Sequence, residues 1–213
     1  VSNTMQKTVV VEIERKVILK AENLKDILEK RGISKIDWFK TDSQGTDLQI
    51  FMSLGEETLA STLAADFEPG IISSYENEDK TWEVLKFMDE RNFWMTGMRV
   101  LGAEKMPKKS RSISTNLLKS LRGGTVASAG WTEMSYLNNA LSNKLELRDH
   151  LLLWVFSTVK NQHGFAYEVA CMGKDRFNDD IFSKLATETE KIAIARNKHK
   201  VLITKILRAF NRV

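Results

Sequence analysis

In the first half of the chain, short apolar runs alternate with segments in which apolar residues recur every three or four positions. The apolar runs predict strands, at residues 9–13, 36–39, 62–67 and 93–101. The periodic segments predict helices, which begin at Asn23, Thr46 and Asp79 and end near Gly32, Gly55 and Arg91. Such an alternation is typical of an α/β layer whose strands pair in parallel.

The second half has helical periodicity almost throughout. Trp131, Met134, Leu137 and Leu141 lie three or four positions apart and predict a helix over 131–141. Further helices are predicted at 145–159, 165–172, 180–196 and 198–212. We therefore expect an α/β protein with a parallel sheet and an α-helical C-terminal extension, which packs on the sheet or on a second chain.

Charge divides the chain at the same place. Residues 1–104 carry 13 basic and 19 acidic side chains, whereas residues 105–213 carry 19 basic and 9 acidic ones. Residues 106–130 contain a Pro, three Gly, five Ser and no acid, which is typical of a loop, with a short helix at 114–122 as an alternative. We expect a sheet domain at 1–105, a basic linker at 106–130 and a helical extension at 131–213.

Composition excludes several classes of protein. Of the 213 residues, 42% are hydrophobic and 28% are charged, as in globular proteins. One Cys and three scattered His residues predict neither a disulfide framework nor a zinc motif. The longest strongly apolar run, 151–156, is too short to cross a membrane, and no secretory signal is visible, so we expect a cytoplasmic protein. Because the first residue is Val, a processed end or a fragment is also expected.

Two acids follow neighbouring predicted strands. Asp42 comes after the strand at 36–39, and Glu68 comes after the strand at 62–67. Ligands of parallel sheets bind at the carboxyl ends of the strands, and adjacent strands are about 4.8 Å apart, so these carboxylates are predicted to share one crevice. On spacing alone the commoner interpretation is that Asp42 caps the next helix and that Glu68 is a solvated strand end.

A specific resemblance begins at Lys40. The run K-T-D-S-Q-G-T-D over 40–47 resembles the K-x-D-x-x-G-x-E/D block of FkbM-type methyltransferases, a family of S-adenosylmethionine-dependent enzymes with a Rossmann-like, class I fold. A similar leader precedes the block, at 17–28, and a similar acidic strand end follows it, at 66–68. The resemblance covers about residues 8–100. Asp47 stands where Glu is commoner in the family.

The resemblance implies roles for the residues of this block. Asp42 is expected on the reaction side of the cofactor, as a general base or as the group that orients the acceptor hydroxyl. Glu68 is expected to contact the acceptor or to hold the loop. The cofactor-binding residues are expected to be Lys40, Gln44, Gly45 and Asp47, with no metal. The expected reaction is O-methylation of a small-molecule or glycan hydroxyl.

The sequence lacks the Gly-rich turn with which this family holds S-adenosylmethionine. No G-x-G turn lies between a predicted strand and a predicted helix. The resemblance therefore implies that residues 1–105 are the C-terminal half of a Rossmann-like methyltransferase domain. Such a chain is expected to be inactive alone and to bind the cofactor poorly.

The last 23 residues, 191–213, form a basic segment with seven Lys or Arg and no acid. Its apolar residues predict an amphipathic helix that lies on an anionic membrane or in a partner groove. The simpler interpretation, a terminal helix with one packed face, is favoured. Nucleic-acid binding would use the same charges but is supported by no recognition motif, so no nucleic-acid partner is expected.

Three further hypotheses remain open. The chain is alternatively a non-catalytic binding or assembly module with a basic helical tail, and measured cofactor binding distinguishes this module from the enzyme. A weaker alternative is a transferase with a nucleotide-sugar donor, which would need a diphosphate site that the sequence does not reveal. An incomplete sheet would also leave an open edge, so a homo-oligomer is a further expectation.

Overall fold

The computed structural model describes residues 20–103 and 128–210, with the side chains from Asn197 onward left out. The strand expected at 9–13, the short helix at 114–122 and most of the expected linker lie outside these residues. Contacts divide the chain into two compact units. Unit 1 holds the described residues up to Arg91 together with Gly97–Tyr136, and unit 2 holds Asn92–Thr96 and the chain from Leu137 onward.

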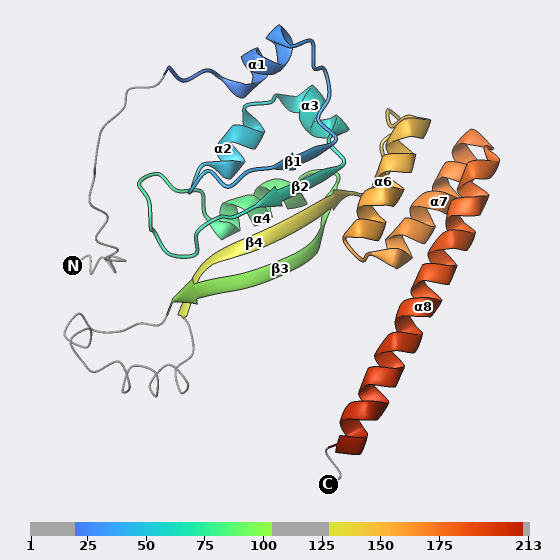
Figure 1. Cartoon of the computed structure of the whole chain (residues 1–213). Coiled ribbons are helices and arrows are strands. Elements are labelled where there is room, and N and C mark those ends of the chain that lie inside the picture. Colours follow the sequence, from blue (N-terminus) through green and yellow to red (C-terminus); the bar gives the residue numbers. More distant parts are fainter. Residues whose placement is uncertain (1–19, 104–127, 211–213) are drawn as a thin grey trace. The chain divides into compact units, whose positions relative to one another are not determined.

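The described strands form one mixed sheet (Figure 1). In the order β1-β2-β4-β3, they are β1 (Trp38–Lys40), β2 (Ala64–Phe67), β4 (Ser128–Asn138) and β3 (Phe93–Ala103). β1 and β2 are parallel, with Phe39 beside Ala65. β4 runs antiparallel to β2, as the bridge between Gly70 and Trp131 shows. The strands predicted at 36–39, 62–67 and 93–101 are confirmed, each with shifted bounds.

Two expectations for the sheet are wrong. The predicted helix over 131–141 is replaced by β4, in which Thr132, Met134 and Tyr136 are buried and the residues between them are half-buried. The sheet is therefore not wholly parallel, because β4 lies antiparallel between β2 and β3. The apolar residues of this segment fit a period of two as well as the helical period, and pairing with β2 and β3 selects the strand.

The helices of unit 1 are short. They are α1 (Leu24–Lys30), α2 (Asp47–Met52), α3 (Glu56–Ser61) and α4 (Thr81–Asp89). Three of them were predicted, and Asn23 caps α1 as expected, because its side chain accepts from the Lys25 amide at 2.9 Å. Only α3 was missed, since it follows α2 directly after Gly55, whose φ of +83° turns the chain.

Aromatic rings join the helices of unit 1 to the sheet. Phe51 of α2 lies 4.8 Å from Phe39 of β1 and 5.3 Å from Phe67 of β2, measured between ring centroids. Phe87 of α4 lies 6.3 Å from Phe51. These rings are buried, so one face of the sheet is covered by α2 and α4. On another face, Asp66 of β2 accepts hydrogen bonds from Trp38 of β1 and from Ser135 of β4.

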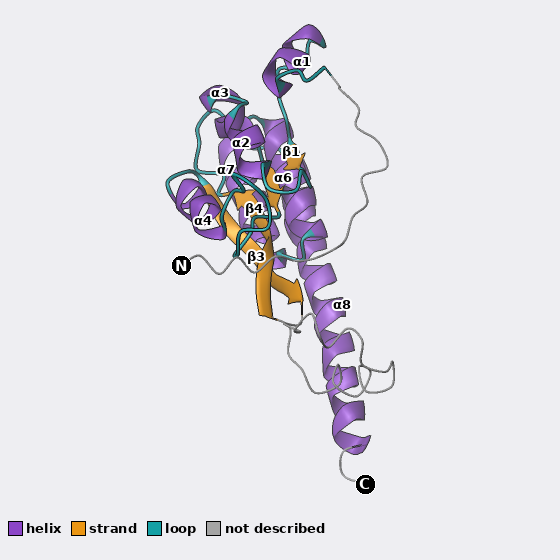
Figure 2. Ribbon diagram, turned by 90° about the vertical axis from the view of Figure 1, so that its left-hand side faces the viewer, coloured by secondary structure: helices purple, strands orange, loops and turns teal. Residues whose placement is uncertain are grey.

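Unit 2 is built mainly of three described helices (Figure 2). They are α6 (Leu147–Val159), α7 (His163–Phe177) and α8 (Asp180–Phe210). The predicted helices at 145–159 and 165–172 are confirmed. The two helices predicted at 180–196 and 198–212 are one continuous helix, α8. Among the described residues, no helix has the length and apolar character needed to cross a membrane.

Candidate carboxylate site at the ends of β1 and β2

The structure brings Asp42 and Glu68 together at one edge of the sheet. Asp42 lies two residues beyond the end of β1, and Glu68 directly follows β2. Because these strands are parallel, both residues leave the sheet at the same end. Their charges interact, since Asp42 contributes to raising the pKa of Glu68. The two carboxylates are therefore close enough for their charges to interact, while the shared crevice and the roles of these residues stay predictions.

Glu68 holds its proton more tightly than an ordinary glutamate. Its half-buried position raises its pKa, and the negative charges of Asp42 and Glu133 raise it further. The positive charge of Lys40 lowers the pKa of Glu68, and the negative charge of Asp47 raises it by a smaller amount. A carboxylate with a raised pKa is a stronger base once it is ionised, which suits proton transfer.

Glu133 is a member of this cluster that the sequence analysis missed. It lies on β4, and the bridge between Gly70 and Trp131 places it opposite Glu68 on the neighbouring antiparallel strand. Arg99 of β3 forms an ion pair with it at 3.1 Å. The residue was missed because the segment was predicted to be helical. The alternation of apolar and polar residues from Thr132 to Tyr136 is the signal that would have revealed it.

The carboxylate of Asp47 holds two loops together. It accepts hydrogen bonds from the Ser43 amide at 2.9 Å, from the Ser43 hydroxyl at 2.5 Å and from the Glu68 amide at 2.9 Å. Burial would raise the pKa of Asp47, but these hydrogen bonds hold it below the ordinary value. Asp47 therefore fixes the loop after β1 against the end of β2, and its cofactor-binding role stays a prediction.

The other residues of the predicted loop have different surroundings. Gln44, at a φ of +59°, donates to Asp42 at 2.7 Å and accepts from the Tyr75 hydroxyl. Gly45 has a φ of +114°, and a Cβ there would come within 3.0 Å of the Glu78 side chain, so this turn requires glycine. Lys40 is exposed. Gln44 thus orients the carboxylate of Asp42.

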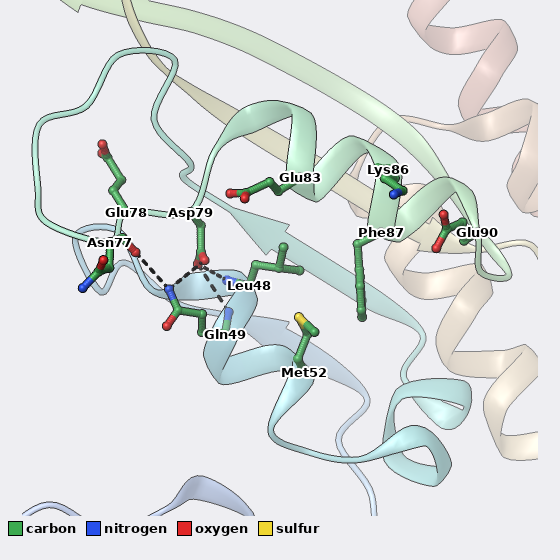
Figure 3. A pocket seen from close by; sticks show the side chains of 10 residues that line it. All are labelled: Leu48, Gln49, Met52, Asn77, Glu78, Asp79, Glu83, Lys86, Phe87 and Glu90. Carbon is green, nitrogen blue, oxygen red and sulfur yellow. Dashed lines mark hydrogen bonds between the residues drawn. The ribbon is translucent and has the colours of Figure 1, made fainter. Parts of the chain in front are cut away.

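Asp79, and not Asp42, caps α2. Its carboxylate accepts from the Leu48 amide at 2.7 Å, the Gln49 amide at 3.3 Å and the Gln49 side chain at 2.9 Å (Figure 3). Asp79 is 5% exposed. The alternative interpretation, in which Asp42 serves as the helix cap, is therefore not supported by these contacts, and Asp42 is left exposed beside Gln44.

A pocket of about 530 Å³ lies between α2 and α4 (Figure 3). Its lining includes Gln49 and Met52 from α2, Glu83 and Phe87 from α4, and Glu90 directly after α4. None of the predicted site residues lines it, so this pocket is distinct from the carboxylate site. Within the described part of the chain, no three His, Cys, Asp or Glu side chains gather closely enough to hold a metal ion.

Comparison with known proteins identifies a family for the first part of the chain. Residues 2–95 match the family model described as the methyltransferase FkbM domain, which confirms the resemblance seen in the sequence. The match covers less than half of the 213 residues and includes Asp42 and Glu68, but not Glu133. No curated protein and no solved structure gives a significant match.

Proposed function

We propose that this protein, as part of an enzyme with an FkbM methyltransferase domain, transfers a methyl group from S-adenosylmethionine to a hydroxyl group of a small molecule or glycan. The observation that carries the proposal is the carboxylate cluster at the ends of β1 and β2, which lies within the matched segment. There Glu68 has a raised pKa beside Asp42. Among the described residues, no feature favours a non-catalytic module.

The reaction assigns a proton-transfer step to this cluster. When bound, the donor would supply an electrophilic methyl group. The acceptor oxygen would form a bond to the methyl carbon, the carbon–sulfur bond would break with its electron pair left on the sulfur of S-adenosylhomocysteine, and the acceptor would lose its proton to a base. Glu68 takes this proton on its carboxylate, since its raised pKa makes it a better base than a solvated glutamate. Asp42, held by Gln44, orients the acceptor hydroxyl. Glu133 strengthens the base by raising its pKa.

We propose that the loop at 40–47 forms only one wall of the donor-binding site. Gln44 and Gly45 form a turn, and Asp47 anchors the residue before it by accepting a hydrogen bond from the Ser43 amide. Lys40 is exposed at the start of the loop. The carboxylate of Asp47 already accepts three hydrogen bonds and has little capacity left for a ligand. We propose that Lys40, Gln44 and Gly45 contact the donor and that a Gly-rich turn outside this sequence supplies the rest of the site.

The strand directions support a partial Rossmann-like sheet. β1 and β2 are parallel and are joined through α2 and α3. β2 and β3 are joined through α4, and both run antiparallel to β4, so β3 points in the same direction as β2. Three strands with helical crossovers are what a doubly wound sheet requires. We propose that β1, β2 and β3 belong to a partial Rossmann-like sheet in which β4 is an antiparallel strand.

Two measurements test the proposal. The first is calorimetric titration with S-adenosylmethionine of this chain and of the full translation product that contains it. We expect binding by the full product, and the absence of binding there would contradict the proposal. The second is an assay of the full translation product, which measures transfer of tritium from S-adenosylmethionine labelled in its methyl group to compounds in a metabolite extract of the source cells. Glu68→Gln should lower this transfer by about 100-fold and Asp42→Asn by about 10-fold.

Matched controls separate catalysis from folding. Glu57→Gln on α3 and Asp26→Asn on α1 remove exposed carboxylates away from the strand ends and should leave transfer unchanged. All four variants should keep the thermal unfolding temperature of the wild type within about 2 °C, because none of the four side chains is fully buried. Unchanged transfer in both Glu68→Gln and Asp42→Asn would remove the cluster from the mechanism.

A further inference from the structure

The C-terminal part of α8 extends beyond the helices that pack against its first part. Phe182 stacks on Phe177 of α7 at 5.8 Å, and Arg196 donates to Asn161 and to His163 at the other end of α7. These contacts align α7 and α8 antiparallel, with Arg196 level with the first residue of α7. The helix continues to Phe210, and Figure 1 shows this part running past α6 and α7. We call residues 197–210 the α8 overhang.

The burial of α8 changes before the overhang begins. Phe182 and Thr189 are buried, and Thr189 accepts a hydrogen bond from Trp154 of α6 at 2.8 Å. From Lys191 to Arg196 only Ile192 is half-buried, and Ile194 is 57% exposed. The helix therefore leaves the packed part of unit 2 while it still carries aliphatic residues. An apolar helix face that leaves a bundle is expected to meet another surface.

The sequence of the overhang separates apolar from basic positions. At 100° per residue, positions 203, 206, 207 and 210 fall within an arc of about 100°, and they are Ile, Ile, Leu and Phe. Positions 198, 205 and 208, all Lys or Arg, fall on the opposite side together with Val201, and Lys200 falls at the border of the apolar arc. No acid occurs from 191 to the end of the chain. A short helix of this kind has no internal ion pairs and is marginal on its own in water.

We infer that the α8 overhang lies on an anionic lipid surface, with its aliphatic side in the headgroup region and its basic side toward the phosphates. Four large apolar residues on one side match the interior of a bilayer interface. The uncompensated positive charge matches anionic lipid. A nucleic acid would attract the basic side chains but would offer no apolar surface for the Ile, Leu and Phe positions, so the membrane surface is the better match. Over the described residues, α8 lacks the apolar character needed to cross the bilayer.

Vesicle flotation of the full chain tests this inference without any assay of methyl transfer. We expect binding to phosphatidylcholine vesicles that contain 30% phosphatidylglycerol, and binding at least ten-fold weaker to pure phosphatidylcholine vesicles. Raising the salt concentration from 0.05 M to 0.5 M should weaken the binding to the anionic vesicles several-fold, because salt screens the charges. Absence of vesicle binding would contradict this inference but would not bear on the proposed enzymatic function.

Variants of the overhang test its two sides separately. The double variant Ile206→Ser with Leu207→Ser should weaken binding to the anionic vesicles at least ten-fold, and Lys205→Gln with Arg208→Gln should weaken it several-fold. The matched control is Ile181→Ser with Val159→Ser, which removes two exposed aliphatic side chains from the packed part of unit 2 and should bind like the wild type. Circular dichroism should show the same thermal unfolding temperature for all three double variants and the wild type.

Several outcomes would overturn the inference. Equal binding to anionic and to zwitterionic vesicles would contradict the role of charge, and full binding by Ile206→Ser with Leu207→Ser would contradict the buried aliphatic side. Absence of binding to the anionic vesicles would remove the membrane altogether. Binding of the chain to an unrelated RNA or DNA oligonucleotide, with none to vesicles, would identify a nucleic acid as the partner instead.

Discussion

Asp42 and Asp47 are five residues apart in the same loop, yet their carboxylates have different surroundings. Asp47 is 2% exposed and accepts three hydrogen bonds from the backbone and side chain of the loops that it joins. Asp42 is exposed and accepts a hydrogen bond from Gln44. A buried carboxylate with several donors stabilises the loop, whereas an exposed and oriented one is free to contact a substrate.

The charges around Glu68 predict shifts of opposite sign at this residue. Removing the charge of Asp42 in Asp42→Asn should lower the pKa of Glu68 toward its ordinary value, because Asp42 raises it. Removing the charge of Lys40 in Lys40→Gln should raise the pKa of Glu68, because the Lys40 ammonium stabilises the ionised form. Carbon-detected NMR titration of the Glu68 carboxyl group measures both shifts.

A distant charge serves as the control for this titration. Asp26→Asn on α1 should leave the pKa of Glu68 where it is in the wild type, since Asp26 is exposed and does not contribute to it. Shifts of the same sign in Asp42→Asn and Lys40→Gln would show that neither charge acts directly on Glu68.

At the scale of elements, α7 and α8 pack so closely that one position of α7 admits only glycine. A Cβ at Gly173 would lie 2.4 Å from the ring of Phe182, which is fully buried. A Cβ at Gly164, near the start of the same helix, would meet nothing within 4 Å. The contact between the two helices therefore depends on the absence of a side chain at 173.

Two alanine variants of α7 should differ in their effect on stability. We expect Gly173→Ala to lower the free energy of unfolding by about 1–3 kcal/mol, because overpacking against Phe182 outweighs the higher helix propensity of alanine. Gly164→Ala should leave it unchanged or raise it by up to about 1 kcal/mol. Urea denaturation measures both values, and equal stability of the two variants would contradict the close packing at Gly173.

At the scale of the whole molecule, the structure predicts how unit 2 responds to acid. His150 and His163 both belong to unit 2. Burial lowers the pKa of His163, and the guanidinium of Arg196 lowers it further. Burial also lowers the pKa of His150, with Arg176 acting in the same direction and the Glu146 carbonyl and Asp149 opposing it. Both histidines are therefore neutral in the folded unit at neutral pH.

Acidification should weaken unit 2. A histidine whose pKa is lower in the folded than in the unfolded state stabilises the fold above about pH 6.5, and this contribution is lost as the pH falls through the folded value. The urea midpoint of the wild type should fall more between pH 7.5 and pH 5.5 than that of His163→Gln. Arg196→Gln should reduce the loss in the same way, and an equal loss in all three proteins would contradict this linkage.

Local signals in the sequence determined most elements of this protein. Strands at 36–39, 62–67 and 93–101 and the cap at Asn23 follow from short-range preferences, and the structure contains them. The adjacency of Asp42 and Glu68 also follows from the sequence, because parallel strands bring their carboxyl ends to one edge. The block at 40–47 could also be recognised from the sequence alone, because its residues are contiguous. The match to the family model over residues 2–95 includes this block.

Only the tertiary structure decided the features that depend on residues distant in sequence. The segment after Gly130 fits a helical period and a strand period alike, and pairing with β2 and β3 makes it β4. That choice brings Glu133 opposite Glu68, a charge interaction across 65 positions that no local pattern contains. The cap of α2 likewise comes from Asp79, 31 residues beyond the amide it accepts from. Hydrogen bonds and charges act through space, so the sequence specifies which groups are available while the fold selects which of them meet.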